Sequence, residues 1–149
     1  MASALIALGG NVGDVRATFK KAIANIRGMT QAALLARSSD YSTTPWGDER
    51  QANFINACIE IETSLDPHAL LFTLQKVEAK FGRERARERR FGPRTLDLDL
   101  LAYDDVILQK PELTLPQSSP VRTCLRIGTA GRDRARPRDR RTQRRIRAG

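Results

Sequence analysis

Two aspartates on alternate positions are the residues that most clearly indicate chemistry. Asp97 and Asp99 flank Leu98 in the segment 95–103, where leucines at positions 96, 98 and 100 alternate with them. In a strand, alternate side chains project from one face, so the two carboxylates would lie together. Such a pair can hold Mg²⁺ while substrate phosphates complete its octahedral shell. A solvated strand face is the alternative for an isolated pair of this kind.

An arginine-rich segment directly before these aspartates favours phosphate binding. Guanidinium groups offer planar sets of donors that match phosphate oxygens. Because acids for a metal and bases for phosphates are close in the sequence, we expect a site that handles a polyphosphate. The chain has no G-x-x-x-x-G-K-[ST] motif, which excludes a P-loop enzyme. The arginines are Arg83, Arg85, Arg87, Arg89, Arg90 and Arg94.

The elements that would position these residues alternate between strands and helices. We expect strands at 4–8, 32–41, 53–63 and 95–103, and a loop at 42–51. One helix would begin at Asp14 and end at Gly28, and a second would begin at Asp66 and end at Gly82. This order predicts a ferredoxin-like α+β sandwich, in which both helices cover one face of an antiparallel sheet.

The other sheet face would be open and would carry the polar residues. In the segment 53–63, isoleucines and an alanine alternate with Phe54, Asn56 and further residues of the opposite face. Asn56 is notable because asparagine is depleted in strands. Phe54 has two interpretations, ordinary packing or an aromatic surface for a ligand. The open face is expected to display Phe54, Asn56, Asp97 and Asp99.

The run RFGPRTLDLDLL at 90–101 resembles the signature of the 6-hydroxymethyl-7,8-dihydropterin pyrophosphokinases, ATP-dependent enzymes of folate biosynthesis. Further segments agree in the family's order: GGN at 9–11, YSTTPWG at 41–47, FINA at 54–57, QKVE at 75–78 and LTLP at 113–116. The resemblance covers residues 1–116 and also implies a ferredoxin-like fold. The family's reaction moves a diphosphoryl group from ATP to the pterin hydroxymethyl group and releases AMP.

The resemblance also implies roles for individual residues. Asp97 and Asp99 would ligate two Mg²⁺ ions that bridge the ATP phosphates. The implied catalytic residues are Arg83, Arg90 and Arg94. The implied ATP-binding residues are Gln75, Glu78, Arg83, Arg85, Arg90, Arg94, Leu100 and Thr114. The implied pterin-binding residues are Thr43, Thr44, Pro45, Trp46, Phe54, Asn56 and Asp97. Such catalysis needs positioning and charge neutralisation, so it requires no histidine base.

The net charge of +9 comes from the end of the chain. Residues 1–117 carry equal numbers of acidic and basic side chains, whereas residues 118–149 carry eleven arginines and two aspartates. We therefore divide the chain into a pterin pyrophosphokinase domain at 1–117, incomplete at its C-terminus, and an arginine-rich tail at 118–149, disordered or non-native. After Pro116 the family continues with a histidine and a Pro-Leu-x-Glu-Ile-Ala-Pro stretch, which are missing here.

A frameshift is our hypothesis for this tail. Codons for residues 128–137 can be chosen so that another frame reads Glu-Pro-Leu-Ala-Glu-Ile-Ala-Pro-Asp. The product would then be a catalytically impaired member of the family. The alternatives are an evolved polyanion-binding arm or a small nucleic-acid-binding protein that uses the tail. Base-binding sheets usually carry several aromatic residues, and only 5% of this chain is aromatic.

The remaining expectations concern location and partners. No basic region followed by an apolar stretch opens the chain, and no segment is long enough to span a membrane. Cys58 and Cys124 are expected to form no disulfide or zinc framework, which fits a reducing cytoplasm. We expect a cytoplasmic monomer that acts on the small molecules ATP and 6-hydroxymethyl-7,8-dihydropterin, without membrane or nucleic acid.

Overall fold

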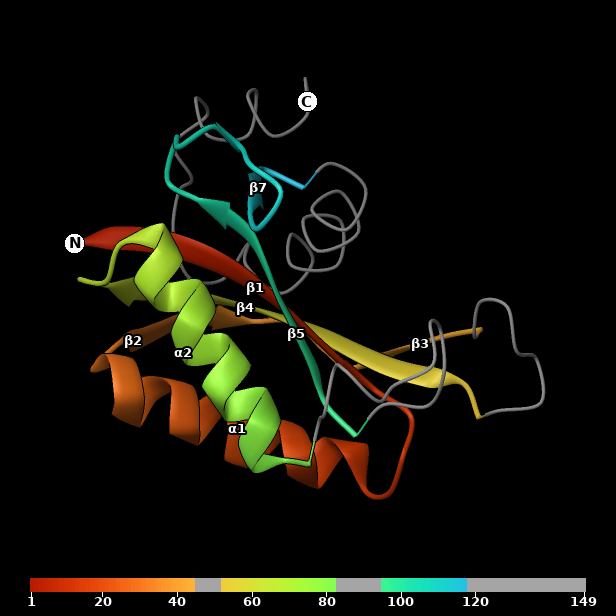
Figure 1. The fold of residues 1–149 in the computed structure, drawn as a ribbon. Coiled ribbons are helices and arrows are strands. Elements are labelled where there is room, and N and C mark those ends of the chain that lie inside the picture. The colour runs from red at the N-terminus through yellow and green to blue at the C-terminus, as the bar shows by residue number, and fades with distance from the viewer. Residues whose placement is uncertain (45–51, 83–94, 118–149) are drawn as a thin grey trace.

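The computed structural model describes residues 1–44, 52–82 and 95–117. Five strands in these ranges form one antiparallel sheet in the order β2-β4-β1-β5, with β3 paired to β4, and β6 pairs with β7 separately. Both helices cover the same face of the large sheet (Figure 1), which confirms the predicted α+β sandwich. The elements are β1 (Ala2–Gly10), α1 (Val15–Thr30), β2 (Ala33–Arg37), β3 (Tyr41–Thr43), β4 (Phe54–Thr63), α2 (Pro67–Lys80), β5 (Asp97–Tyr103), β6 (Leu108–Gln109) and β7 (Thr114–Leu115).

Both helices begin at the aspartates that the sequence predicts. The Asp14 carboxylate accepts a hydrogen bond from Ala17 N at 3.2 Å, and the Asp66 carboxylate accepts one from Ala69 N at 2.8 Å. Each bond satisfies a backbone donor that the first helical turn leaves without a partner. Pro67 follows Asp66 in the first turn, where its missing N–H costs nothing.

The predicted end of the first helix at Gly28 is wrong. The helix continues to Thr30, and the left-handed residue that follows is Gln31, with φ 51°. The reason is the buried side chain of Thr30, whose Oγ1 donates a hydrogen bond to the carbonyl of Ile26 at 2.6 Å. This contact and the burial keep the last turn helical past an exposed glycine.

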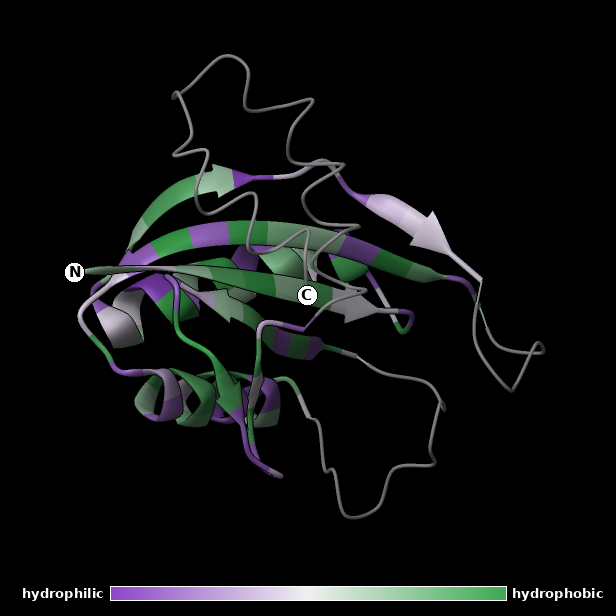
Figure 2. Ribbon diagram, turned by 90° about the horizontal axis from the view of Figure 1, so that it is seen from above, coloured by the Kyte–Doolittle hydropathy of each residue, from purple (hydrophilic) through white to green (hydrophobic). Residues whose placement is uncertain are grey.

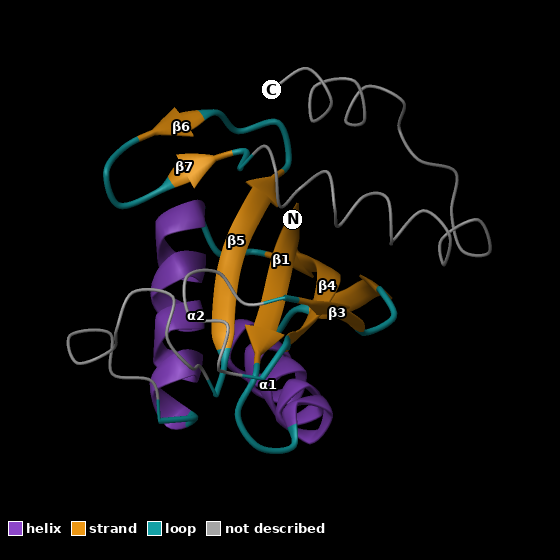
Figure 3. Ribbon diagram, turned by 90° about the vertical axis from the view of Figure 1, so that its right-hand side faces the viewer, coloured by secondary structure: helices purple, strands orange, loops and turns teal. Residues whose placement is uncertain are grey.

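The strand expected at 32–41 is interrupted by a corner at 38–40, which separates β2 from β3, and β3 includes residues 42 and 43 of the expected loop. Asp40 holds that corner, because its carboxylate lies 3.1 Å from Arg37 Nη1 and 3.3 Å from Arg16 Nε on α1. The separate hairpin of β6 and β7, which the sequence analysis does not expect, lies beyond the C-terminal end of β5 (Figure 3). Neither helix of the described ranges is long and apolar enough to cross a membrane.

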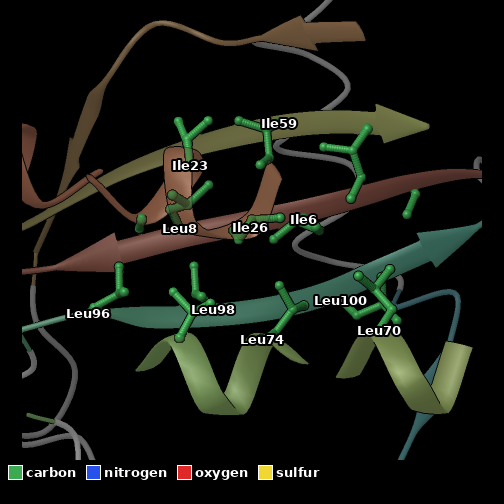
Figure 4. Close-up of a cluster of buried hydrophobic side chains, with 14 of the residues drawn as sticks. Ile6, Leu8, Ile23, Ile26, Ile59, Leu70, Leu74, Leu96, Leu98 and Leu100 are labelled. Carbon is green, nitrogen blue, oxygen red and sulfur yellow. The ribbon is translucent and has the colours of Figure 1, made fainter. Parts of the chain in front are cut away.

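The main core lies between the helices and the sheet. Hydrophobic and hydrophilic residues alternate along β4 (Figure 2), and one alternate set of hydrophobic residues from each of β4 and β5 faces the helices. In β5 these are Leu98 and Leu100, which pack against Leu70 and Leu74 of α2 (Figure 4). The period-two pattern that the sequence analysis used for both strands is therefore confirmed.

The helix-free face of the sheet carries a second, smaller cluster of buried residues: Leu5, Cys58, Leu101 and Ala102. Cys58 is disulfide-bonded, so the expectation that it would take part in no disulfide is wrong. The other half of that bond lies outside the described residues. With two cysteines in the whole sequence, no spacing pattern was available from which to predict the bond.

Candidate functional site

Three strands from distant parts of the sequence bring Asn56, Gly9 and Asp97 into one row. Gly9 on β1 pairs with Asn56 on β4 and with Asp97 on β5. Neighbouring strands lie about 4.8 Å apart, so the backbones of Asn56 and Asp97 are separated by roughly 10 Å. The neighbours of the row along the three strands, Leu8, Ala57 and Leu98, belong to the core beneath the helices, so the row lies on the other face, as the sequence alternation predicts.

Gly9 keeps the middle of this row open. A Cβ atom at Gly9 would lie 3.3 Å from Asn56 Oδ1 and 4.0 Å from Asp97 Cβ. The side chains of Asn56 and Asp97 therefore lie on either side of bare backbone. The sequence predicts a turn at Gly9 and Gly10 after a strand at 4–8, which is wrong, because β1 continues to Gly10 and Gly9 pairs with strands on both sides. A glycine inside a strand is itself a signal of close approach by a ligand or another backbone.

Asn56 is oriented by the short strand β3. Its Nδ2 donates a hydrogen bond to Thr43 Oγ1 at 2.9 Å. In the pairing of β3 with β4, Tyr41 lies opposite Asn56 and Thr43 lies opposite Phe54. With its donor side bound by β3, Asn56 has its Oδ1 close to Gly9. The amide oxygen is thus available to accept a hydrogen bond from a ligand over the row.

The other expected pterin-binding residues lie at the same end of β4 or beyond the described ranges. Phe54 and Asn56 are partly exposed, and Thr43 and Thr44 are exposed. The structure therefore brings Thr43, Phe54 and Asn56 together on two paired strands. Pro45 and Trp46 lie outside the described residues.

The two aspartates of β5 have the chemistry of a partial magnesium site. Asp97 is half-buried, Asp99 is exposed, and the leucine between them is buried in the core. Their carboxylates are hard oxygen donors, which Mg²⁺ prefers, and Mg²⁺ is often held by one or two carboxylates together with substrate phosphates. Within the described ranges no cluster of three or more possible metal ligands occurs. The described residues thus fit a metal whose remaining ligands come from the substrate and water.

The expected ATP-binding residues differ in their exposure to solvent. Gln75 is exposed on α2, whereas Glu78 is only 2% exposed and its Oε2 accepts a hydrogen bond from Leu98 N at 2.9 Å. The Leu100 side chain is buried in the core, and its carbonyl accepts a hydrogen bond from Gln117 Nε2 at 2.9 Å. Thr114 is exposed in β7. The arginines Arg83, Arg85, Arg90 and Arg94 lie outside the described residues.

The fold is similar to that of a solved HPPK-DHPS protein, crystallised in complex with substrates, with a TM-score of 0.55 at 13% sequence identity. The match covers 84% of this chain and 31% of that one, so this chain spans about a third of the solved protein. The likeness shows the fold.

Curated relatives share more of the sequence. Three proteins named 2-amino-4-hydroxy-6-hydroxymethyldihydropteridine pyrophosphokinase are similar over most of the chain. The one from Methylorubrum extorquens is 42% identical over 116 residues, covering 78% of this chain and 72% of its own. The one from Bacillus subtilis is 41% identical over 113 residues (76% and 66%), and that from Haemophilus influenzae is 40% identical over 116 residues (78% and 71%).

The fold, the paired carboxylates of β5 and these relatives place the chain in the class of pyrophosphate-transferring enzymes. The family model of 7,8-dihydro-6-hydroxymethylpterin-pyrophosphokinase matches residues 5–124. The chain belongs to this family, which confirms the resemblance seen in the sequence.

Proposed function

We propose that the chain catalyses ATP-dependent diphosphoryl transfer to 6-hydroxymethyl-7,8-dihydropterin in folate biosynthesis. The hydroxymethyl oxygen attacks the β-phosphorus of ATP, the bond from that phosphorus to the bridging α–β oxygen breaks, and AMP leaves. The hydroxyl proton passes to solvent. The observation that carries this proposal is the Asn56–Gly9–Asp97 row, with Asp99 beside it, in a member of this family.

The row supports binding of a flat, polar heterocycle. A pterin laid over Gly9 would meet only backbone there, because no side chain separates Asn56 from Asp97. The Asn56 oxygen would accept a hydrogen bond from a ring N–H, and Phe54 would offer an aromatic surface. Thr43 and Thr44 would add polar groups at the ring edge. The hydroxymethyl group would then lie toward Asp97.

The aspartates and arginines would handle the phosphates. Asp97 and Asp99 would hold the two Mg²⁺ ions, which neutralise the charge of the polyphosphate when bound. Arg83, Arg90 and Arg94 are proposed to bind the transferred and leaving phosphates, and Gln75 and Thr114 to contact the nucleotide. These groups orient two reactants and offset developing charge, which is most of what phosphoryl transfer requires of a protein.

AMP formation from ATP and the pterin in the presence of Mg²⁺ tests the proposal. Asp99→Asn should abolish AMP formation and the Mg·ATP-dependent rise in melting temperature, because it removes one of two expected metal ligands. The unliganded melting temperature should change little, since Asp99 is exposed. Asp105→Asn is the matched control, because Asp105 is also an exposed aspartate but lies beyond the end of β5. A normal Mg·ATP response in Asp99→Asn would contradict the metal role.

We also propose that the enzyme acts as a monomer in the cytoplasm, the compartment that supplies ATP. The monomer is supported by the row itself, whose residues all come from strands of one chain. Analytical ultracentrifugation of the active protein and fractionation of cells test the two statements separately. A dimer as the smallest active species, or activity confined to membranes, would contradict them.

A further inference from the structure

We propose that Glu78 is a positioning residue for the two metal-binding aspartates, acting through the backbone of β5 and not through contact with ATP. The inference rests on the proposed function to the extent that Asp97 and Asp99 are taken as the metal ligands. The carboxylate of Glu78 would fix the peptide between them, and with it the direction of both side chains.

The burial of Glu78 is the first observation. Within the described ranges it is the one charged residue in the buried set, at 2% exposure, and it lies on the same face of α2 as Leu74. Burying a carboxylate is costly unless hydrogen bonds compensate for lost water. Here Oε2 accepts the backbone N–H of Leu98, which is 20 residues away in the sequence, at 2.9 Å. This bond gives the buried acid a defined partner on β5.

The place of Leu98 in the sheet explains why that N–H needs a partner. In the described sheet β5 is an edge strand, paired with β1 on one side, and Leu98 lies opposite Leu8. Along an antiparallel edge, alternate backbone N–H groups point away from the neighbouring strand. The N–H of Leu98 points to α2 and meets Glu78 instead of another strand. The Glu78 carboxylate thus accepts the backbone hydrogen bond that a further strand would otherwise accept.

The residues just before β5 also lie close against β1. A Cβ atom at Gly10 would lie 2.6 Å from the carbonyl oxygen of Thr95, so β1 passes very close to the residue two before Asp97. Backbone contacts of β1 and the carboxylate of α2 therefore both restrain the start of β5. Since Asp97 and Asp99 are the two neighbours of Leu98, a rotation of that peptide would move both carboxylates. Groups that hold metal ligands in place without contacting the metal commonly affect metal affinity by tenfold or more.

Three variants separate positioning from other roles. Glu78→Ala removes the acceptor, Glu78→Gln keeps an acceptor oxygen without charge, and Val77→Ala is the control. Val77 is a fully buried neighbour in the same turn, so its truncation lowers stability without removing the bond to β5. Exchange of the Leu98 amide proton, followed by NMR, reports the bond directly. Binding of Mn²⁺ with a non-hydrolysable ATP analogue, followed by electron paramagnetic resonance, reports the metal site without catalysis.

We expect Glu78→Ala to speed exchange at Leu98 and to weaken Mn²⁺ binding at least tenfold. Val77→Ala should leave Mn²⁺ binding within about twofold of the original, and Glu78→Gln should restore most of the loss. Equal Mn²⁺ affinity in Glu78→Ala and Val77→Ala would overturn the proposal. A Mn²⁺ affinity of Glu78→Gln as low as that of Glu78→Ala would also overturn it, because the metal site would then require the negative charge of Glu78 and not its hydrogen bond. If Glu78→Ala does not fold, a Glu78→Gln that exchanges Leu98 normally but has lost Mn²⁺ affinity overturns it equally.

Failure of the inference and failure of the proposed function would look different. Absence of AMP formation by the unmodified chain, with Mn²⁺ binding that still depends on Glu78, would contradict the reaction alone. Normal AMP formation by Glu78→Ala, with unchanged Mn²⁺ affinity, would contradict the positioning role alone.

Discussion

Replacing Gly9 by alanine adds one methyl group between Asn56 and Asp97, which makes it the sharpest test of the row. The new Cβ would lie 3.3 Å from Asn56 Oδ1, so the amide must move by only a few tenths of an ångström. Alanine is favoured over glycine inside a strand by about 0.5–1 kcal/mol, which offsets that small strain. We expect the free energy of unfolding to change by less than about 1 kcal/mol, and the melting temperature by less than about 4 °C.

The expected effect on the pterin is much larger. The methyl carbon stands about 1.5 Å above the backbone, so a ring lying on the row must rise or slide by roughly 1 Å. A misplacement of that size at a reacting group costs about a hundredfold in rate. At about 1.4 kcal/mol per tenfold, this equals about 2.7 kcal/mol of transition-state stabilisation. The Mg·ATP affinity should stay within about twofold, because the methyl group does not lie between the two aspartates.

Steady-state AMP formation at varied pterin and saturating Mg·ATP measures this effect, and thermal melts measure stability. Gly28→Ala serves as the control, because Gly28 has no atom within 4 Å of an added Cβ and lies in α1, away from the row. A Gly9→Ala protein with unchanged kcat/KM for the pterin would refute the idea that the ring lies over Gly9. A loss of Mg·ATP affinity equal to the loss for the pterin would refute it as well.

Three further predictions concern stability and the tail. Gly28→Ala should raise the free energy of unfolding by about 0.5–1 kcal/mol in urea denaturation, because an exposed helical glycine is replaced without a clash. Burial, followed by two nearby aspartate charges, raises the pKa of Tyr103, whose hydroxyl donates to the Leu65 carbonyl at 2.6 Å. The neutral phenol therefore stabilises the fold below its unfolded pKa of about 10, and that contribution is lost as pH rises through the higher folded pKa. Tyr103→Phe should flatten the alkaline fall of melting temperature and cost about 1 kcal/mol at neutral pH. Replacing residues 118–149 with the corresponding C-terminus of a full-length relative should raise AMP formation about a thousandfold. The replacement would restore the missing histidine and Pro-Leu-x-Glu-Ile-Ala-Pro stretch, which the resemblance implies supply phosphate contacts and a second aromatic face for the pterin. Equal rates would contradict the frameshift hypothesis.

The faces of β4 and β5 could be predicted from the sequence because a strand repeats every two residues. That period assigned Asn56, Asp97 and Asp99 to the helix-free side, and the structure confirms the assignment. The row itself could not be predicted, since it depends on strand order and register. Nothing local in the sequence states that Gly9, of all residues of β1, lies between Asn56 and Asp97.

Burial in the core explains two differences between the expectations and the structure, the end of α1 beyond Gly28 and the place of Glu78. Gly28 is a common helix terminator, but tertiary burial of Thr30 outweighs the preference of a single glycine. Glu78 is expected from the resemblance to bind ATP, whereas the structure buries it against β5. Its position carried a usable signal, because it follows Leu74 by four residues and Val77 by one, on the side of the helix that faces the core. A charged residue at such a position indicates a buried partner.

The hydrophobic pattern of β5 also determines which face of the sheet carries Asp97 and Asp99. Shifting the register of β5 by one residue would turn Asp97 and Asp99 into the core and Leu98 out of it. The core between the sheet and α2, which Leu98 and Leu100 fill, opposes that shift, because two carboxylates would lose their water without compensation. The bond from Glu78 to Leu98 acts in the same sense, because it ties one particular peptide of the strand to the helix. Packing therefore selects the register, and the register places Asp97 beside Gly9, on the other side from Asn56, and Asp99 beside Ala7. The stability of this sheet and the geometry of its site thus depend on the same few residues.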